Sequence, residues 1–106
     1  MEVAEKKVLV FGSGISGIGA AGLLEERGAK VVLYGNEKLD RQAVKDQLGT
    51  DSKTEIVLGA FPEELLGVLD MVIISPGVPT DLPIVKKMHE KKIPVIGEIE
   101  LAYQLG

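Results

Sequence analysis

The sequence contains no cysteine, no tryptophan and a single histidine, His89, among its 106 residues. The absence of cysteine excludes a disulfide-stapled fold, a zinc site built from thiolates and catalysis by a thiol. A lone histidine without cysteine leaves no recognisable metal-ligand cluster. His89 falls among charged residues of an expected helix, where exposure is the commoner outcome than catalysis. We therefore predict neither a catalytic residue nor a metal site in this chain.

Aromatic residues make up only 4% of the chain, whereas hydrophobic residues make up 45%. The core must therefore consist of Val, Ile, Leu and Ala, which favours a sheet covered by helices. The net charge of −4 argues against nucleic acid or an anionic membrane as partner, because both attract basic surfaces. No apolar run approaches the roughly 20 residues that cross a bilayer, and no secretory signal is recognisable. We expect a cytoplasmic protein.

Short apolar runs alternate with amphipathic segments, which is the pattern of βαβ units. Strands are expected at residues 8–11, 30–34, 55–58, 71–74 and 94–97, and helices at 16–27, 40–48, 61–67, 82–92 and 98–105. The fourth strand is apolar on both faces and so central, while Pro94 indicates an edge strand or a strand start. Because the length is that of a single domain, residues 1–106 are predicted to form one α/β domain, with right-handed crossovers between its parallel strands. Its sheet is Rossmann-like, doubly wound, five-stranded and parallel, in the order 3-2-1-4-5.

A glycine-rich turn, GSGISG, joins the first expected strand to the first expected helix. In this pattern Gly12 allows a tight turn, Gly14 lets the backbone approach a pyrophosphate, and Gly17 lets the helix pack closely on the sheet. The amides of Ile15, Ser16 and Gly17 would point at an anion from a helix N-terminus. The Ser16 hydroxyl can add a donor or cap the helix. A structural turn without a ligand is the alternative.

A second constrained loop, SPGVP, follows the fourth strand, and its Ser75 can donate a hydrogen bond to a phosphate. An ordinary strand-to-helix turn is the alternative. In a doubly wound sheet ligands bind at the carboxyl ends of the strands where the strand order reverses, here between the first and fourth strands. Both loops are expected to end in that cleft. Nearby, Glu98 and Glu100 are expected to be helix-start acids rather than an acid/base pair.

A nicotinamide-binding sheet places an acid at the end of its second strand. This chain has Tyr34-Gly35-Asn36 there, and Glu37 comes too late, although Tyr34 and Asn36 can contact a base or sugar. The missing acid weakens the alternative of an NAD(P)-binding regulatory or dehydrogenase module without removing it. A ligand-free interaction domain that keeps the same fold is a third possibility.

Three segments together resemble the Mur ligases of bacterial peptidoglycan synthesis: VLVFGSGISG at 8–17, ISPGVP at 74–79 and IPVIGEIEL at 93–101. The last two are most similar to the branch that adds D-glutamate. The resemblance extends from about Lys7 to the C-terminus. It implies the N-terminal domain of a three-domain enzyme, which binds the UDP part of UDP-N-acetylmuramoyl-L-alanine. It also implies partner domains, a central ATPase that uses ATP and Mg2+ and a C-terminal domain, in a cytoplasmic enzyme of cell-wall biogenesis, cell shape and cell division.

The resemblance also implies residue roles. The Ile15 and Ser16 amides would contact the diphosphate. Ser75 and Gly77 would line the side of the cleft that holds the uridine and phosphate groups, and residues 35–37 would face the uracil. Members of the family usually carry an acid at the position of Gly35, for which the amide of Asn36 can substitute. The chain alone is expected to be a non-catalytic monomer without a cofactor of its own. The predicted UDP-binding residues are Gly14, Ile15, Ser16, Gly17, Gly35, Asn36, Glu37, Ser75, Pro76 and Gly77.

Overall fold

A computed structural model describes residues 3–12, 15–35, 41–49, 53–59, 61–75 and 81–105. The described strands are β1 (Lys7–Phe11), β2 (Lys30–Gly35), β3 (Glu55–Leu58), β4 (Met71–Ile74) and β5 (Val95–Gly97). The described helices are α1 (Ile15–Glu26), α2 (Arg41–Leu48), α3 (Pro83–Glu90), α4 (Glu98–Leu105) and the 3-10 helix η1 (Glu63–Gly67). The elements occur in the predicted order, and η1 is a 3-10 turn with Pro62 at its N-cap rather than an α-helix.

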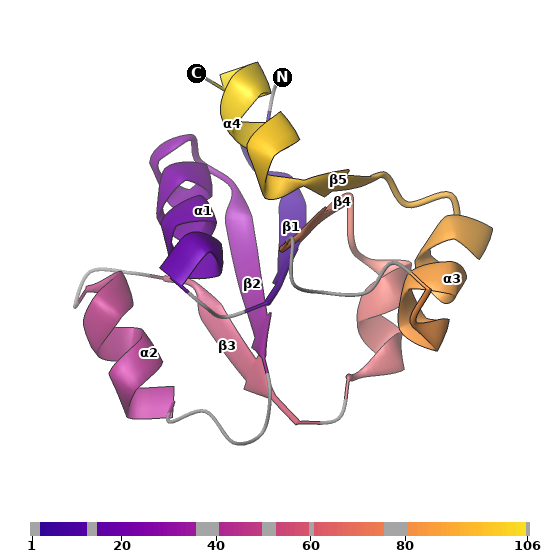
Figure 1. The fold of residues 1–106 in the computed structure, drawn as a ribbon, viewed down its shortest axis with the longest axis horizontal. Coiled ribbons are helices and arrows are strands. Elements are labelled where there is room, and N and C mark those ends of the chain that lie inside the picture. Colours follow the sequence, from indigo (N-terminus) through magenta and orange to yellow (C-terminus); the bar gives the residue numbers. More distant parts are fainter. Residues whose placement is uncertain are drawn as a thin grey trace.

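The strands form one parallel sheet in the order β3-β2-β1-β4-β5, as predicted (Figure 1). Strand β4 lies between β1 and β5, and all four of its residues are buried. Strand β5 lies at the edge, and Pro94 immediately precedes it. The Pro94 carbonyl accepts a hydrogen bond from the Val72 amide at 2.8 Å, so the residue that lacks an amide still joins the sheet through its oxygen.

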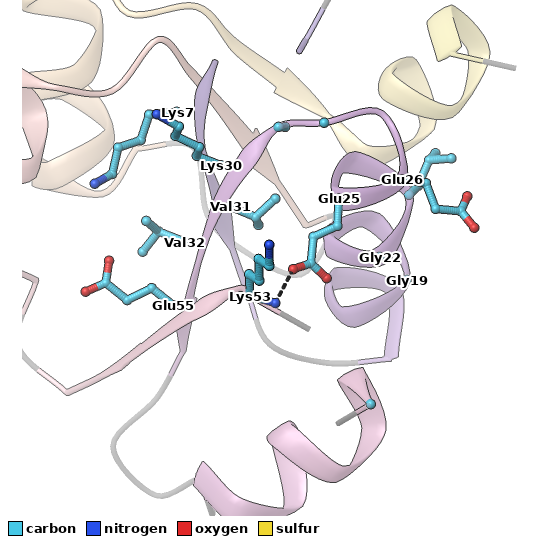
Figure 2. Close-up of a pocket in the computed structure, with 14 residues that line it drawn as sticks. Lys7, Gly19, Gly22, Glu25, Glu26, Lys30, Val31, Val32, Lys53 and Glu55 are labelled. Carbon is cyan, nitrogen blue, oxygen red and sulfur yellow. Dashed lines mark hydrogen bonds between the residues drawn. The ribbon is translucent and has the colours of Figure 1, made fainter. Parts of the chain in front are cut away.

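Helix α1 ends at Glu26, and Gly28 follows two residues later. Gly28 has a φ of 85°, a conformation that favours glycine. The amides of Gly28 and Ala29 donate to the carbonyls of Glu25 and Leu24, both at 3.0 Å, which is the Schellman arrangement. The Glu25 side chain also accepts a hydrogen bond from the Lys53 amide at 2.7 Å, which ties α1 to the segment before β3 (Figure 2).

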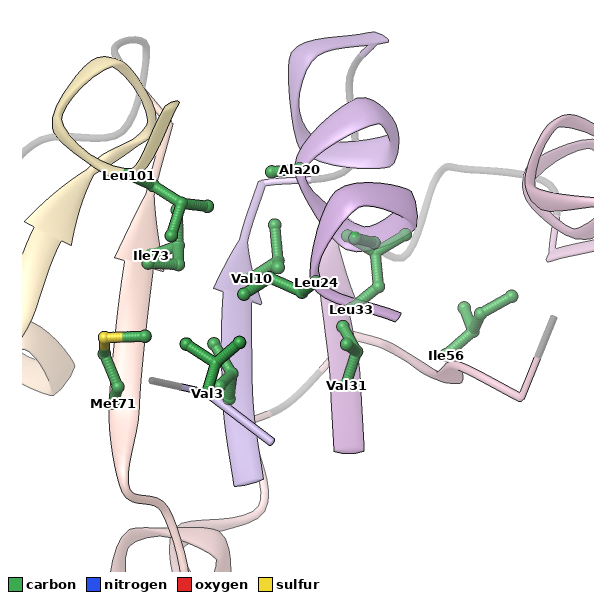
Figure 3. Close-up of a cluster of buried hydrophobic side chains, with 12 residues drawn as sticks. Val3, Val10, Ala20, Leu24, Val31, Leu33, Ile56, Met71, Ile73 and Leu101 are labelled. Atoms are coloured by element: carbon green, nitrogen blue, oxygen red, sulfur yellow. The ribbon is translucent and has the colours of Figure 1, made fainter. Parts of the chain in front are cut away.

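Two hydrophobic cores lie on opposite faces of the sheet, because successive side chains of each strand point to opposite sides. On one face, α1 and α4 cover the sheet, and Leu24 and Leu101 point toward strand residues such as Val10 and Ile73 (Figure 3). On the other face, η1 and α3 cover it. The buried residues of that second core are Leu9, Phe11, Val32, Leu66, Leu69, Val72, Met88 and Ile93. Helices on both faces explain why the strands read as continuous apolar runs. Within the described part of the chain, no helix has the length and apolarity needed to cross a membrane.

Candidate functional site

The register of the sheet aligns the carboxyl ends of four strands. Phe11 pairs with Tyr34 on one side and with Ile74 on the other, and Ile74 in turn pairs with Gly97. The residues that directly follow these four aligned residues in the sequence form the next row, at the carboxyl edge of the sheet. In order across the sheet, that row consists of Gly35, Gly12, Ser75 and Glu98. We refer to these four residues as the edge row.

Backbone hydrogen bonds hold the edge row together. The Gly12 amide donates to the Tyr34 carbonyl at 2.9 Å, and the Ser75 amide donates to the Phe11 carbonyl at 3.1 Å. The glycine turn and the loop after β4 therefore begin side by side, at the point where the strand order reverses. The first residues of the two loops, Gly12 and Ser75, are therefore neighbours at the place where such sheets bind ligands. Convergence of the rest of the two loops stays a prediction, because residues 13–14 and 76–80 lie outside the described residues.

Two glycines of the turn, Gly12 and Gly17, occupy positions that disfavour any other residue. Gly12 has a φ of 120°, which a side chain would strain. A Cβ added at Gly17 would lie 1.9 Å from the Gly12 carbonyl oxygen, so only glycine lets α1 pack this closely on the turn. Helix α1 begins at Ile15, so Ser16 lies inside the first turn instead of at its cap. No acidic side chain occupies that first turn.

The Ser75 hydroxyl donates a hydrogen bond to Glu98 Oε1 at 2.5 Å, and both side chains are half-buried. Ser75 immediately follows β4, and Glu98 is the first residue of α4. Glu98 and Glu100 both lie in the first turn of α4, as predicted for helix-start acids. Sequence reasoning missed the contact with Ser75. The register of β4 and β5 contains its signal, because the residues that follow two paired strand ends are neighbours.

An aromatic cluster supports the same edge from the face that α3 covers. The Tyr34 ring lies 5.0 Å from that of Phe11 and 5.2 Å from that of Phe61, measured between centroids. The Tyr34 hydroxyl donates to the Gly59 carbonyl, and the Gly59 amide donates to the Gly35 carbonyl at 3.3 Å. The end of β2 is thus tied to the segment after β3. With its proton donated to Gly59, the Tyr34 hydroxyl can offer a base or sugar only an acceptor.

Comparison with known proteins places the whole chain in one family. Residues 6–97 match the family model described as "Mur ligase MurD-like, N-terminal domain". The chain belongs to the MurD-like family of Mur ligases. It is 58% identical over 104 residues to the UDP-N-acetylmuramoylalanine–D-glutamate ligase of Lachnospira eligens, covering 97% of this chain and 23% of that protein. The protein of the same name from Lachnoclostridium phytofermentans is 48% identical over 107 residues, which cover 100% of this chain and 24% of the relative.

The chain thus spans about a quarter of the length of the curated relatives that it matches. Among solved structures, the precorrin-2 dehydrogenase SirC has a TM-score of 0.60 and 14% identity, over 90% of this chain and 45% of SirC. At that identity the likeness shows a shared Rossmann-like fold alone. It does not favour dehydrogenase function for a MurD-like chain.

The described part of this MurD-like domain includes half of the predicted site. For Ile15 and Ser16 the backbone is described, and Gly17, Gly35 and Ser75 are placed at or beside the edge row. The remaining predicted residues, Gly14, Asn36, Glu37, Pro76 and Gly77, lie outside the described residues.

A separate groove of the MurD-like domain lies toward the opposite, amino end of the strands (Figure 2). It has a volume of about 1230 Å³, and its lining includes the first residues of β1 and β2, Lys7 and Lys30, together with Glu25 and Lys53. Gly19 and Gly22 of α1 also line the groove. Sequence reasoning did not predict this groove, and none of the predicted UDP-binding residues lines it.

Two further titratable side chains of the described residues, Glu63 and His89, lie on η1 and α3. His89 is exposed on α3, as predicted. The Lys87 ammonium donates to Glu63, and this hydrogen bond together with the opposite charge lowers the pKa of that exposed carboxyl. Among residues with described positions, no three His, Cys, Asp or Glu side chains gather into a group suited to a metal ion.

Proposed function

We propose that residues 1–106 form the UDP-binding N-terminal domain of a UDP-N-acetylmuramoyl-L-alanine–D-glutamate ligase. The observation that carries this proposal is the family match over residues 6–97. It is supported by the position of the glycine turn, which opens at the strand-order reversal of the sheet. A nucleotide bound there would lie across the edge row, between the first turn of α1 and the loop that follows β4.

In this proposal the diphosphate lies at the start of α1. The first amides of a helix have no partner within the helix, and the helix dipole favours an anion at that end. Ile15 and Ser16 supply such amides, and no acidic side chain competes for them in the first turn. The absence of a side chain at Gly14 would let phosphate oxygens approach the backbone, and Gly17 keeps the helix start close to the turn.

The uridine part of the ligand would extend from the phosphates toward the ends of β2 and β4. Residues 35–37 would face the uracil, and the amide of Asn36 would substitute for the acid that family members usually carry at the position of Gly35. Residues 75–77 would line the opposite side. The hydrogen bonds of Gly59 with Tyr34 and Gly35 support this assignment, because they hold the β2 end in a fixed position.

The chemistry of the proposed ligase belongs to polypeptide beyond this domain. The sequence contains no G-x-x-x-x-G-K-[ST] loop for ATP. In the complete enzyme, ATP with Mg2+ would convert the substrate carboxylate to an acyl phosphate, which the D-glutamate amine attacks. The domain by itself would be a non-catalytic monomer. Its partners would be the UDP-linked substrate and the central ATPase and C-terminal domains of the same enzyme, which builds peptidoglycan in the bacterial cytoplasm and so supports cell shape and division.

Titration of the 15N-labelled chain with UDP, followed by NMR, tests this function. We expect saturable shifts concentrated at residues 12–17 and 75–79, with weak affinity because other domains also contact the substrate. A parallel titration with NADH separates the alternatives. Shifts with NADH and none with UDP would support a nicotinamide-binding module. No response to either nucleotide at millimolar concentration would support a ligand-free interaction domain.

A further inference from the structure

The hydrogen bond between Ser75 and Glu98 fixes which partner supplies the proton. An ionised carboxylate has only acceptor lone pairs, so the hydroxyl of Ser75 must be the donor in the 2.5 Å contact with Glu98 Oε1. A serine hydroxyl has one proton and two lone pairs. With its proton committed to Glu98, the hydroxyl can offer a ligand only an acceptor.

Glu98 also sets the local charge at this end of the edge row. Its carboxylate lies next to Ser75, at the first residue of α4, and Glu100 adds a second acid in the same turn. The first turn of α1, the helix that follows β1, carries no acid. The charges of the two helix starts therefore differ, although both lie at the carboxyl edge and their helices cover the same face of the sheet.

We propose that Glu98 is a positioning residue that determines how a nucleotide lies across the edge row. By holding the Ser75 proton it presents the hydroxyl oxygen to an uncharged hydrogen-bond donor of the nucleoside, a sugar hydroxyl or a base N–H. By its charge it disfavours phosphate near Ser75 and so directs the diphosphate to the start of α1. This inference rests on the proposed UDP-binding function, and it replaces the expectation that Ser75 donates to a phosphate.

The Ser75→Ala variant distinguishes the two roles of the hydroxyl. Affinities for uridine, inorganic pyrophosphate and UDP are measured by NMR titration at low ionic strength. Loss of one neutral hydrogen bond weakens binding about threefold to tenfold. We expect that loss for uridine and for UDP, and no change for pyrophosphate. Weaker pyrophosphate binding with unchanged uridine binding would overturn the proposal, because it would make Ser75 a phosphate donor.

The Glu98→Gln variant tests the charge, with Glu100→Gln as its matched control. Both substitutions remove one negative charge from the first turn of α4, but Glu100 is exposed and its carboxylate is bonded by Gln104. We expect Glu98→Gln to tighten pyrophosphate and UDP about threefold at low salt, with the gain shrinking as salt is added. Uridine affinity should stay nearly constant, because a glutamine oxygen can still accept from Ser75. Glu100→Gln should change all three affinities less.

A merely structural role of Glu98 predicts different results. It would lower all three affinities together, without salt dependence, and that result would overturn the proposal. Equal gains in Glu98→Gln and Glu100→Gln would also overturn it, because the effect would then belong to the helix start in general. Melting curves confirm that each variant is folded, and if Glu98→Gln is not, the Ser75→Ala titrations still test the proposal. If the unmodified chain fails to bind UDP, the proposed function falls and this inference falls with it, whereas UDP binding with the wrong variant pattern overturns the inference alone.

Discussion

The N-termini of α1 and α4 have the same position at the sheet edge but differ in the charge of their first turns. Both helices follow parallel strands at the same edge of the sheet, and both pack on the same core. Helix α1 follows a glycine turn and has no acid in its first turn, whereas α4 begins directly after Gly97 with Glu98. The positive end of α4 is thus matched by its own carboxylates, while that of α1 has none. First-turn side chains, more than the fold, decide which helix start suits an anion.

The two helix starts are also fixed to the sheet by opposite means. Helix α1 packs closely on the glycine turn because Gly17 has no side chain. A methyl group at Gly17 would have no room beside the Gly12 carbonyl. Helix α4 is anchored by a side chain, because Leu101 is buried in the core against residues such as Ile73. Substitutions at these two anchors therefore test the comparison most strongly.

The largest effect is expected for Gly17→Ala. The new Cβ would lie 1.9 Å from the Gly12 oxygen, so α1 must move away from the turn. We expect a loss of about 3 kcal/mol or more in the free energy of unfolding, measured by urea denaturation. Gly19→Ala is the matched control, because a Cβ there meets nothing within 4 Å. It should stabilise the chain by about 0.5–1 kcal/mol through helix propensity. Similar results for both variants would contradict a close contact at Gly17.

Truncation of Leu101 tests the anchor of α4. Leu101 is 1% exposed, and removing a buried leucine side chain leaves a cavity, so Leu101→Ala should cost about 2–3 kcal/mol of unfolding free energy. Tyr103 lies on the same helix and is 84% exposed. Tyr103→Ala should therefore change stability by less than about 0.5 kcal/mol. A negligible cost for Leu101→Ala would mean that α4 does not belong to the cooperative unit formed with the sheet.

Binding at the start of α1 is tested by Gly14→Val. The proposed mode requires a bare backbone at this position, so a valine side chain should occupy the space of a phosphate. We expect UDP affinity to fall at least tenfold, about 1.4 kcal/mol, while the melting temperature changes little. NMR titration measures the affinity of both proteins. Unchanged affinity would place the phosphate site elsewhere, and the contrast between the two helix starts would then have no bearing on ligand binding.

The sequence predicts the fold closely because its signals are local or follow general rules. Continuous apolar runs such as residues 71–74 identify buried strands, Gly28 ends a helix, and right-handed crossovers limit the strand order to a few possibilities, which include the observed one. The 3-10 character of η1 was not predictable in the same way. An acid pair after Pro62 marks a helix start, but the sequence pattern does not distinguish an α-helical turn from a 3-10 turn over so few residues.

For the candidate site, the arrangement of the loop beginnings was predictable from the sequence, and their side-chain hydrogen bonds were less so. The loop beginnings at Gly12 and Ser75 follow from the strand order, and the close approach at Gly17 follows from the glycine pattern. The partner of the Ser75 proton depends on the register between β4 and β5, which side-chain patterning alone does not give. The groove beside Glu25 likewise depends on how far α1 stands from the segment that contains Lys53.

The smallest effects are expected at the start of α4, where the stability of two glutamate variants can be compared. Glu98→Gln weakens both the helix-dipole interaction and a charge-assisted hydrogen bond with Ser75, so we expect a loss of about 1 kcal/mol in unfolding free energy. Glu100→Gln weakens the dipole interaction on an exposed position, and we expect a loss of about 0.3 kcal/mol. Urea denaturation at low salt measures both. If the two losses were equal, the bond to Ser75 would add nothing to the dipole effect, and α4 would differ from α1 only in the charge of its first turn.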